Sequence, residues 1–182
     1  MSLFTLLNTP RGPLWDRVMV LLSRPDLIVA FFVFLGLVLV VRKGRGMIGV
    51  PLVALLMVIL ADALCARVLK PYFARPRPYA LLSGVRVYKG GRFRKIEHPL
   101  RARHYGFPSC HATNTAAATG VFWMADPILG IIAAGFSFMV GLSRVYLGHH
   151  FPEDVLFGWI IGAGIGLTGG LLWRKWKKTR EP

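Results

Sequence analysis

The chain has 182 residues, of which 54% are hydrophobic, and its mean hydropathy is +0.53. That composition is too apolar for an ordinary soluble domain and is typical of a protein with repeated membrane spans. The net charge of +15, from 23 Lys and Arg against 8 Asp and Glu, indicates contact with anionic headgroups, cytoplasmic anchoring or an anionic substrate, and in the absence of a soluble basic domain it argues against nucleic acid as a partner.

The first half of the chain carries two apolar stretches that are long enough to cross a membrane. They cover residues 26–41 and 46–69, and the basic turn RKGR closes the first. Residues 13–24 are apolar on one face but too short to span, which predicts an interfacial helix or part of a tilted first span. The N-terminus lacks a basic start and a clean cleavage site, so we expect no cleavable signal peptide.

The second half is organised around one long polar segment. Residues 70–107 hold ten Lys and Arg but one Glu, which predicts a basic outer loop. Residues 108–125 have a helical pattern with a polar start, and residues 127–147 and 152–173 predict the last two spans. Several glycines of the last span suit close helix packing in lipid: Gly162, Gly164, Gly166, Gly169 and Gly170.

These patterns predict an all-α fold, namely a polytopic membrane helix bundle. A strand exposed to lipid would leave its backbone groups unsatisfied, so the spans are expected to be helices. We expect five to six transmembrane helices, with an interfacial helix at the N-terminus, in a single domain over residues 1–182. Membrane lipids are the expected surroundings, and the sequence indicates no obligate protein partner.

Polar residues that can carry chemistry occur where the predicted spans end. Following the chain through the bilayer places the end of span 46–69 and the start of helix 108–125 at one membrane face. The end of span 127–147 and the start of the last span return to the same face. We therefore expect one cluster there, made of Lys70, Arg77, Ser109, His111, Arg144, His150 and Asp154.

Four members of this cluster are suited to bind phosphate. Lys70, Arg77 and Arg144 are cationic donors, and the guanidinium fork of arginine matches pairs of phosphate oxygens. Ser109 precedes a helix, where its hydroxyl and the free N–H groups of the first turn favour an anion. Taken alone, Ser109 also fits a simple N-cap.

The other three members suit phosphoryl transfer. Asp154 can accept a hydrogen bond from one imidazole nitrogen of His150 and leave the other free to attack, although alone it also fits a carboxylate that complements a helix dipole. His111 can donate a proton to a leaving oxygen. Because three cations can stabilise the equatorial oxygens, the cluster predicts phosphoryl transfer with no metal and no other cofactor. The five histidines show no zinc-like spacing.

The segments that carry these residues resemble three motifs of the type 2 phosphatidic acid phosphatase superfamily. KPYFARPRP, residues 70–78, matches Lys-x6-Arg-Pro, and PSCH, residues 108–111, resembles Pro-Ser-Gly-His. SRVYLGHHFPED, residues 143–154, matches Ser-Arg-x5-His-x3-Asp. The resemblance covers residues 46–173 and implies a six-helix integral-membrane lipid phosphatase with a phosphohistidine intermediate.

The resemblance also implies a role for each matching residue. His150 is the nucleophile, Asp154 orients it and His111 is the general acid, whereas His149 lies one residue outside the motif. The implied phosphate-binding residues are Lys70, Arg77, Ser109 and Arg144, and we add Cys110 because its backbone N–H can donate at the same helix start. We expect the remaining histidines, His98, His104 and His149, to be polar loop residues.

Two cysteines and one carboxylate need separate interpretation. Cys110 stands where the family has glycine; its N–H can still donate to phosphate, and a catalytic thiolate is an alternative because a helix N-terminus lowers a thiol pKa. Cys65 lies within an apolar run, so we expect no structural disulfide. Asp62 lies within a span, where a carboxylate is costly, and is expected to pair with a polar neighbour.

The predicted function is hydrolysis of a terminal phosphate from an anionic lipid phosphate or pyrophosphate. Arg92, Arg94 and Lys95, with aromatic residues nearby, would dock a polyanionic lipid head at the headgroup layer. Lipid A 1-phosphate fits best, and undecaprenyl pyrophosphate or phosphatidylglycerol phosphate are the alternatives. An anion-binding membrane carrier without enzymatic activity is the alternative from a different class.

The charges flanking the spans predict a bacterial inner-membrane protein whose site faces the periplasm. The RKGR turn and the RKWKKTR tail lie on the face opposite the site, and basic flanks favour the cytoplasm. The basic outer loop has ten Lys and Arg against eight in these two flanks, so a raw count favours the reverse. We give the higher number of Lys and Arg in the loop less weight, because these cations are expected to bind the anionic substrate.

Overall fold

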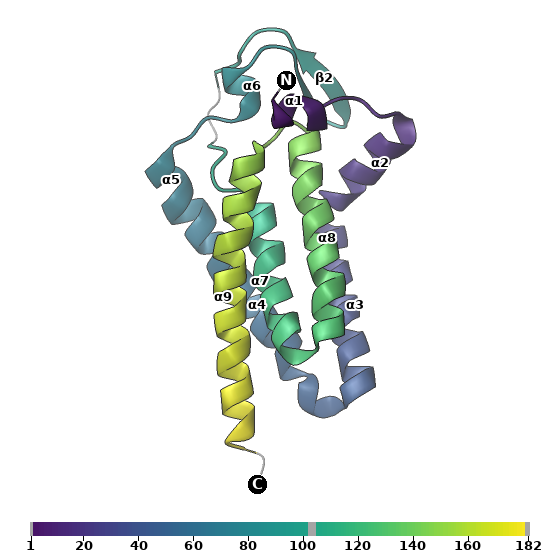
Figure 1. Ribbon diagram of the computed structural model, residues 1–182, viewed down its shortest axis with the longest axis vertical. Helices are drawn as coiled ribbons and strands as arrows, with labels where there is room; N and C mark the ends of the chain where they lie inside the picture. The colour runs from purple at the N-terminus through teal and green to yellow at the C-terminus, as the bar shows by residue number, and fades with distance from the viewer. Residues whose placement is uncertain (1, 102–104, 181–182) are drawn as a thin grey trace.

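The computed structural model describes residues 2–101 and 105–180, and His104 of the sequence analysis lies outside them. Figure 1 shows an elongated helix bundle with a small hairpin and short helices at one end. The N-terminal half contains α1 (Leu3–Leu7), α2 (Pro13–Leu22), α3 (Pro25–Lys43), a 3-10 turn (Arg45–Met47), α4 (Gly49–Ala63), a π-helical segment η2 (Leu64–Leu69) and α5 (Lys70–Phe73). The second half contains α6 (Pro78–Leu81), β1 (Val85–Lys89), β2 (Arg92–Ile96), α7 (Cys110–Ala125), α8 (Pro127–Tyr146) and α9 (Pro152–Lys178).

Four helical runs in the described residues are long and apolar enough to cross a membrane: α3, the run from Arg45 to Phe73, α8 and α9. Large apolar side chains such as Phe34, Leu52 and Ile160 are exposed on them, as expected for surfaces that face lipid. With α7, the described bundle has five helices. This number is the lower end of the predicted range of five to six. The sixth helix implied by the resemblance is missing from this count because α2, at about 15 Å, is too short to span.

The centre of the bundle is α7, which packs against α4, α8 and α9 (Figure 1). Glycines on α9 allow the closest approach: a Cβ added to Gly162 would lie 2.1 Å from the Thr113 carbonyl oxygen, and one at Gly166 would lie 2.0 Å from that of Ala117. Small residues let helix backbones meet in this way. The predicted packing role is confirmed for these two glycines and is wrong for Gly164, which has no atom within 4 Å of such a Cβ.

A two-stranded antiparallel hairpin, β1–β2, is the main departure from the purely helical expectation. The strands pair from Val85–Ile96 to Lys89–Arg92, around two glycines with positive φ. The bundle itself is helical as predicted, and the hairpin stands at its end, beyond the spans (Figure 1). Two short strands joined by Gly-Gly carry the signal of a hairpin turn, which the high charge of this segment obscures.

The N-terminal segment fastens this hairpin to the end of α8. The Asn8 side chain donates to the carbonyl oxygens of Arg86 and Tyr146, both at 2.8 Å, and accepts from the Arg86 N–H at 2.8 Å. The Arg86 guanidinium donates to both carboxylate oxygens of Asp16, and the Tyr146 hydroxyl donates to the same carboxylate. The Arg86 guanidinium carbon also lies 3.5 Å from the ring centre of Phe93. We call these five residues the Arg86 cluster.

The opposite end of the bundle holds the α3–α4 turn, the α7–α8 turn and the C-terminus (Figure 1). Asp126 caps α8 by accepting from the N–H groups of Ile128 and Leu129. The same carboxylate pairs with Lys43 at 3.1 Å and Arg42 at 3.8 Å. The two turns are therefore linked electrostatically at the face opposite the hairpin.

Candidate active site

The residues of the three motifs lie at helix ends on the hairpin side of the bundle. Lys70 begins α5 and Arg77 caps α6, whereas Ser109 caps α7. Arg144 is in the last turn of α8, and Asp154 is in the first turn of α9. The backbone joins two of these ends directly, because the Ser109 N–H donates to the Asp154 carbonyl oxygen at 2.9 Å. His111 is in the first turn of α7 and His150 directly precedes the cap of α9, so all seven predicted residues lie at this end of the bundle.

His150 and Asp154 form a buried pair at the start of α9. His150 is 3% exposed and Asp154 is fully buried. The Nδ1 atom of His150 lies 3.6 Å from Oδ2 of Asp154, which also accepts from the Phe151 N–H at 2.9 Å. Burial, and then the charge of Arg144, hold the pKa of His150 well below its ordinary value. The imidazole is therefore neutral near pH 7 and has a lone pair available.

The neighbouring histidine also belongs to the cluster, which the sequence did not predict. His149 is half-buried, and its Nδ1 accepts from Nη1 of Arg77 at 3.4 Å. Burial and the charges of Arg144 and Arg77 lower the pKa of His149 to about 3. His149 lies in a loop, as expected, but the tight turn at Gly148 directs it back toward Arg77 at the start of α6.

Three polar atoms in this cluster are buried without a partner. Ser109 Oγ, Arg144 Nε and His150 Nδ1 have no hydrogen-bond partner in the described part of the chain. Within residues 2–101 and 105–180, no carboxylate lies within 4.0 Å of the charged nitrogens of Lys70, Arg77 or Arg144. Buried donors without an acceptor and cations without a counter-charge are costly, so this arrangement fits a site that an anion completes.

His111 contacts the N-terminal region rather than another motif residue. Its Nε2 lies 3.2 Å from the Ser23 carbonyl oxygen, between α2 and α3. A carbonyl oxygen can only accept, so Nε2 carries the hydrogen and Nδ1 is the free nitrogen. The Ser23 hydroxyl bonds that of Ser143 at 2.7 Å. One residue of the N-terminal region therefore contacts both the second and the third motif.

Cys110 is joined to Cys65 by a disulfide, which corrects the sequence expectation that Cys65 is unpaired. Cys65 is buried in η2, where the helix packs beside the start of α7, a proximity that position within an apolar run does not reveal. The bonded sulfur also rules out a Cys110 thiolate in this form of the protein. The Cys110 N–H remains in the first turn of α7, where N–H groups lack an intrahelical acceptor and can face an anion.

One helical turn further into the membrane, Asp62 accepts from the Asn114 side-chain amide at 2.8 Å. The predicted pairing of this intramembrane carboxylate is confirmed. Among the described residues, no group of three or more His, Cys, Asp and Glu is arranged to hold a metal ion.

The three basic residues predicted to bind a headgroup lie on the second strand of the hairpin. Arg92, Arg94 and Lys95 are all exposed on β2, and Lys95 pairs with Glu97 at 3.1 Å. The hairpin itself contacts the segment before His150, since the Tyr88 N–H donates to the Leu147 carbonyl oxygen at 3.1 Å. The basic strand therefore stands beside the site, not within it.

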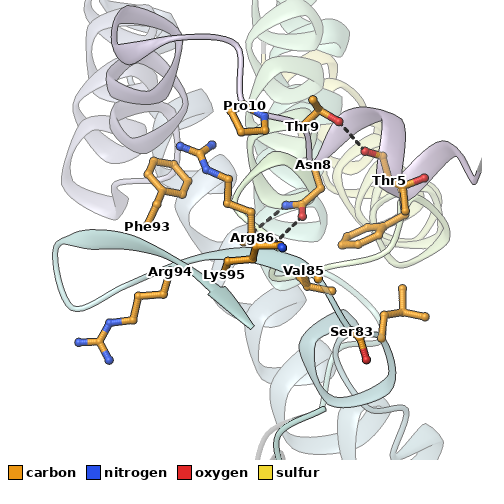
Figure 2. Close-up of a pocket in the computed structure, with 13 residues that line it drawn as sticks. Thr5, Asn8, Thr9, Pro10, Ser83, Val85, Arg86, Phe93, Arg94 and Lys95 are labelled. Atoms are coloured by element: carbon orange, nitrogen blue, oxygen red, sulfur yellow. Dashed lines mark hydrogen bonds between the residues drawn. The ribbon is translucent and has the colours of Figure 1, made fainter. Parts of the chain in front are cut away.

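A groove of about 450 Å³ lies between the N-terminal segment and the hairpin (Figure 2). Asn8, Arg86 and Phe93 line it together with Arg94 and Lys95. Arg94 extends away from Arg86 in this view. The lining includes none of the motif residues, so the groove is separate from the histidine site.

Comparison with known proteins decides the family. The model of the PAP2 superfamily matches residues 51–180. The chain belongs to the PAP2 superfamily. This confirms the resemblance drawn from the three motifs and makes the chain a membrane protein of a lipid phosphatase family.

The relatives within the superfamily differ in the lipid for which they are named. The chain is 27% identical to the undecaprenyl-diphosphatase of Sulfolobus acidocaldarius, over 90% of this chain and 73% of the relative. It is 28% identical to the lipid A 4'-phosphatase of Bacteroides thetaiotaomicron, over 88% of this chain and 71% of the relative. Relatives with different substrate names are thus equally similar, and identity alone does not select a lipid.

Two solved structures share the fold. The crystal structure of Aquifex aeolicus LpxE superposes with a TM-score of 0.59 at 26% identity, over 92% of each chain. A transmembrane PAP2-type phosphatidylglycerolphosphate phosphatase from Bacillus subtilis gives a TM-score of 0.62 at 24% identity, over 94% of this chain and 83% of that one. The predicted helical membrane fold is therefore confirmed.

Sequence reasoning missed three contacts of the site. Arg75 donates to the Asp154 carboxylate at 3.0 Å, but its motif position is a spacer between Lys70 and Arg77. Ser23 lies before the matched residues 51–180, and no local signal marks it. His149 could have been found, because Gly148 precedes it, and a glycine allows a tight turn that returns the next residue toward the site.

Proposed function

We propose that this protein is a lipid phosphatase that removes a terminal phosphate through a phosphohistidine formed at His150. The observation that carries the proposal is the pair of buried, unpartnered polar atoms, Ser109 Oγ and Arg144 Nε, beside a neutral buried imidazole. A phosphate group supplies acceptors for both donors and counter-charge for the surrounding cations. The same phosphate would lie against the nucleophile.

The first chemical step is attack by His150 on phosphorus. Because Nδ1 faces Asp154, Nε2 forms the N–P bond while the bond from phosphorus to the lipid oxygen breaks. Asp154 stabilises the imidazole as it gains charge. The leaving oxygen takes a proton from the doubly protonated ring of His111. Because the Nε2 hydrogen stays bonded to the Ser23 carbonyl oxygen, the transferred proton comes from Nδ1, and the ring is left neutral.

The second step regenerates the enzyme. Water attacks the phosphohistidine, loses a proton to Nδ1 of His111 and releases inorganic phosphate, while His150 recovers its lone pair. In both steps Lys70, Arg77 and Arg144 stabilise the negative equatorial oxygens. These fixed cations supply the charge that a divalent ion would otherwise provide, so activity should persist in a chelator.

Lipid A 1-phosphate is the substrate we propose, with undecaprenyl diphosphate second. The exposed basic strand with Arg92, Arg94 and Lys95 favours a large, polyanionic head beside the site. Similarity to a lipid A 4'-phosphatase supports a lipid A substrate, and similarity to an undecaprenyl-diphosphatase supports the second candidate.

We further propose that the site faces the periplasm of a bacterial inner membrane. The Cys65–Cys110 disulfide lies at the site face, and disulfides persist in oxidising compartments. The basic α3–α4 turn and the C-terminal end of α9 lie at the opposite face, as expected for the cytoplasmic side. Both features favour the same orientation.

A phosphate-release assay on purified lipids tests the function. The panel holds lipid A phosphorylated at position 1 or at position 4', undecaprenyl diphosphate, phosphatidylglycerol phosphate and a short phosphatidic acid, each with EDTA. We expect release from the 1-phosphate to be fastest and to disappear in His150→Ala. Faster release from the 4'-phosphate or from undecaprenyl diphosphate would overturn the substrate, and binding without release would favour the carrier.

The same assay tests the basic strand. Replacing Arg92, Arg94 and Lys95 together with glutamine should slow turnover of lipid A more than that of the short phosphatidic acid. The difference should shrink in high salt, because exposed charges are screened. Equal losses on both substrates would mean that the strand serves the fold or membrane anchoring.

A further inference from the structure

Arg75 lies in the spacer of the first motif and reaches the buried carboxylate of the third. Its Nη1 donates to Oδ1 of Asp154 at 3.0 Å. The guanidinium carbon lies 4.8 Å from the ring centre of Phe151, and Nη2 is 3.7 Å from the Glu153 carboxylate. The arginine is therefore itself held in place by the residues that follow His150.

The two oxygens of Asp154 have different partners. Oδ2 accepts from the Phe151 N–H at 2.9 Å and faces His150 Nδ1 at 3.6 Å, whereas Oδ1 accepts from Arg75. A donor on each oxygen fixes the plane of the carboxylate, so the oxygen that faces the imidazole cannot rotate away. Arg75 supplies the donor that Oδ1 of this fully buried carboxylate requires.

The backbone of Arg75 adds a second constraint. Its carbonyl oxygen accepts from the Gly106 N–H at 2.7 Å. A Cβ added to Gly106 would lie 3.2 Å from Oδ2 of Asp154. The chain segments before α6 and before α7 thus pack closely against the carboxylate, and a side chain at position 106 would press on Oδ2.

Arg75 neutralises Asp154, which leaves the other three cations of the site without a carboxylate partner among the described residues. It pairs with the one carboxylate among the seven predicted cluster residues, so Lys70, Arg77 and Arg144 have no carboxylate within ion-pairing distance in the described chain. These three cations remain available to an external anion. Arg75 serves the nucleophile side of the site, and the others serve the phosphate side.

We propose that Arg75 is a positioning residue that acts through Asp154 to orient His150, a role that rests on the proposed function. Arg75→Ala should lower kcat by about 10- to 100-fold, as loss of a partner that orients a catalytic group does, with KM within about threefold. Arg75→Lys should recover part of kcat, since one donor can reach Oδ1. Arg67→Ala is the matched control, because Arg67 is an exposed arginine in the preceding segment η2 and has no assigned role in the site.

A double-mutant cycle separates positioning from phosphate binding. If Arg75 acts through Asp154, Arg75→Ala should cause no further loss of kcat in an Asp154→Asn background. If Arg75 binds the substrate directly, KM rises and the losses multiply in the double variant, which would overturn the proposal.

A readout without turnover distinguishes this proposal from the function itself. The ¹⁵N resonance of His150 Nδ1 should shift in Arg75→Ala and remain unchanged in Arg67→Ala. If the wild type released no phosphate from any lipid, the proposed function would fail, and this spectrum would still decide the role of Arg75. An unchanged His150 resonance in Arg75→Ala would refute the positioning role.

Discussion

Two arginines at the same end of the bundle have opposite surroundings. Arg86 donates to both oxygens of Asp16, contacts the Tyr146 hydroxyl and packs on Phe93. Arg144 is in the last turn of α8, next to the same region, yet its Nε is buried without a partner in the described chain. One guanidinium is satisfied by the protein, and the other is not.

This difference separates a structural site from a binding site. A satisfied ion pair contributes to the folded state and has little left to offer a ligand. A buried cation without a counter-charge destabilises the empty protein and gains when an anion arrives. The Arg86 cluster is therefore expected to hold the hairpin against α8, and the Arg144 region is expected to bind phosphate.

The largest effect should come from Arg144→Ala. Removing a buried donor to the developing charge should lower kcat/KM by about 10²- to 10³-fold. The midpoint of thermal unfolding in detergent should stay the same or rise, because an uncompensated buried charge is removed. Inorganic phosphate should raise the midpoint of the wild type and leave that of the variant unchanged. A clear fall of the midpoint in Arg144→Ala would contradict the comparison.

Gly162→Ala tests the close contact between α7 and α9, whose first turns carry site residues. The new methyl group would meet the Thr113 carbonyl oxygen at 2.1 Å, so α7 must shift. We expect a loss of about 3 kcal/mol of unfolding free energy, the upper end for overpacking, together with reduced activity. Gly164→Ala is the matched control, since nothing lies within 4 Å of its added Cβ. Equal midpoints for the two variants would mean that the α7–α9 contact is looser than described.

Arg86→Ala should give the reverse pattern of Arg144→Ala. Loss of its charged hydrogen bonds should lower the free energy of unfolding by about 2 kcal/mol. Phosphate release at a temperature where the variant is folded should stay within a few-fold of wild type, because Arg86 lies outside the histidine site. Thermal unfolding and kinetics on the same preparation measure both effects. A collapse of activity with unchanged stability would show that the assignment of the two arginines is inverted.

Acid should weaken the two regions in different pH windows. The pKa of His149 is about 3 and that of His150 is also lowered, so the unfolded state binds protons more readily than the folded state below about 6.5. Stability should therefore fall as the pH drops from that value. Burial acts to raise the pKa of Asp16, but hydrogen bonds from Arg86 and Tyr146 outweigh it and keep the pKa below its ordinary value. Its contribution should be lost only as the pH falls through that lower folded value.

Unfolding midpoints measured from pH 8 to pH 3 check this order. His149→Gln should flatten the upper part of the profile, whereas Asp16→Asn should flatten the part below about pH 4. A wild-type midpoint that is constant from pH 7 to pH 5 would contradict the lowered histidine pKa values.

Much of the site could be predicted because membrane topology restricts where helix ends lie. Spans of fixed length bring Lys70, Ser109, Arg144 and Asp154 to one face without knowledge of side-chain contacts. The same reasoning gave the helix boundaries closely, since apolar runs and turn prolines define them. The hairpin was missed because its charge suggested a basic loop at the headgroup layer.

The remaining contacts depend on packing between segments that are distant in sequence. Cys65 and Cys110 are 45 residues apart, and their pairing depends on how η2 meets the start of α7. Arg75 and Asp154 are 79 residues apart, and the local sequence gives no reason to connect them. Such pairs follow from three-dimensional proximity, which hydropathy and motif spacing do not contain.

Trapping the covalent intermediate tests the central claim most directly. Purified protein is mixed with ³²P-labelled lipid A 1-phosphate, quenched rapidly at alkaline pH, where phosphohistidine survives, and digested for mass spectrometry. We expect an acid-labile phosphate on the peptide that contains His150, present in His149→Ala and absent in His150→Ala. Labelled phosphate on His149, or full turnover by His150→Ala, would contradict the account.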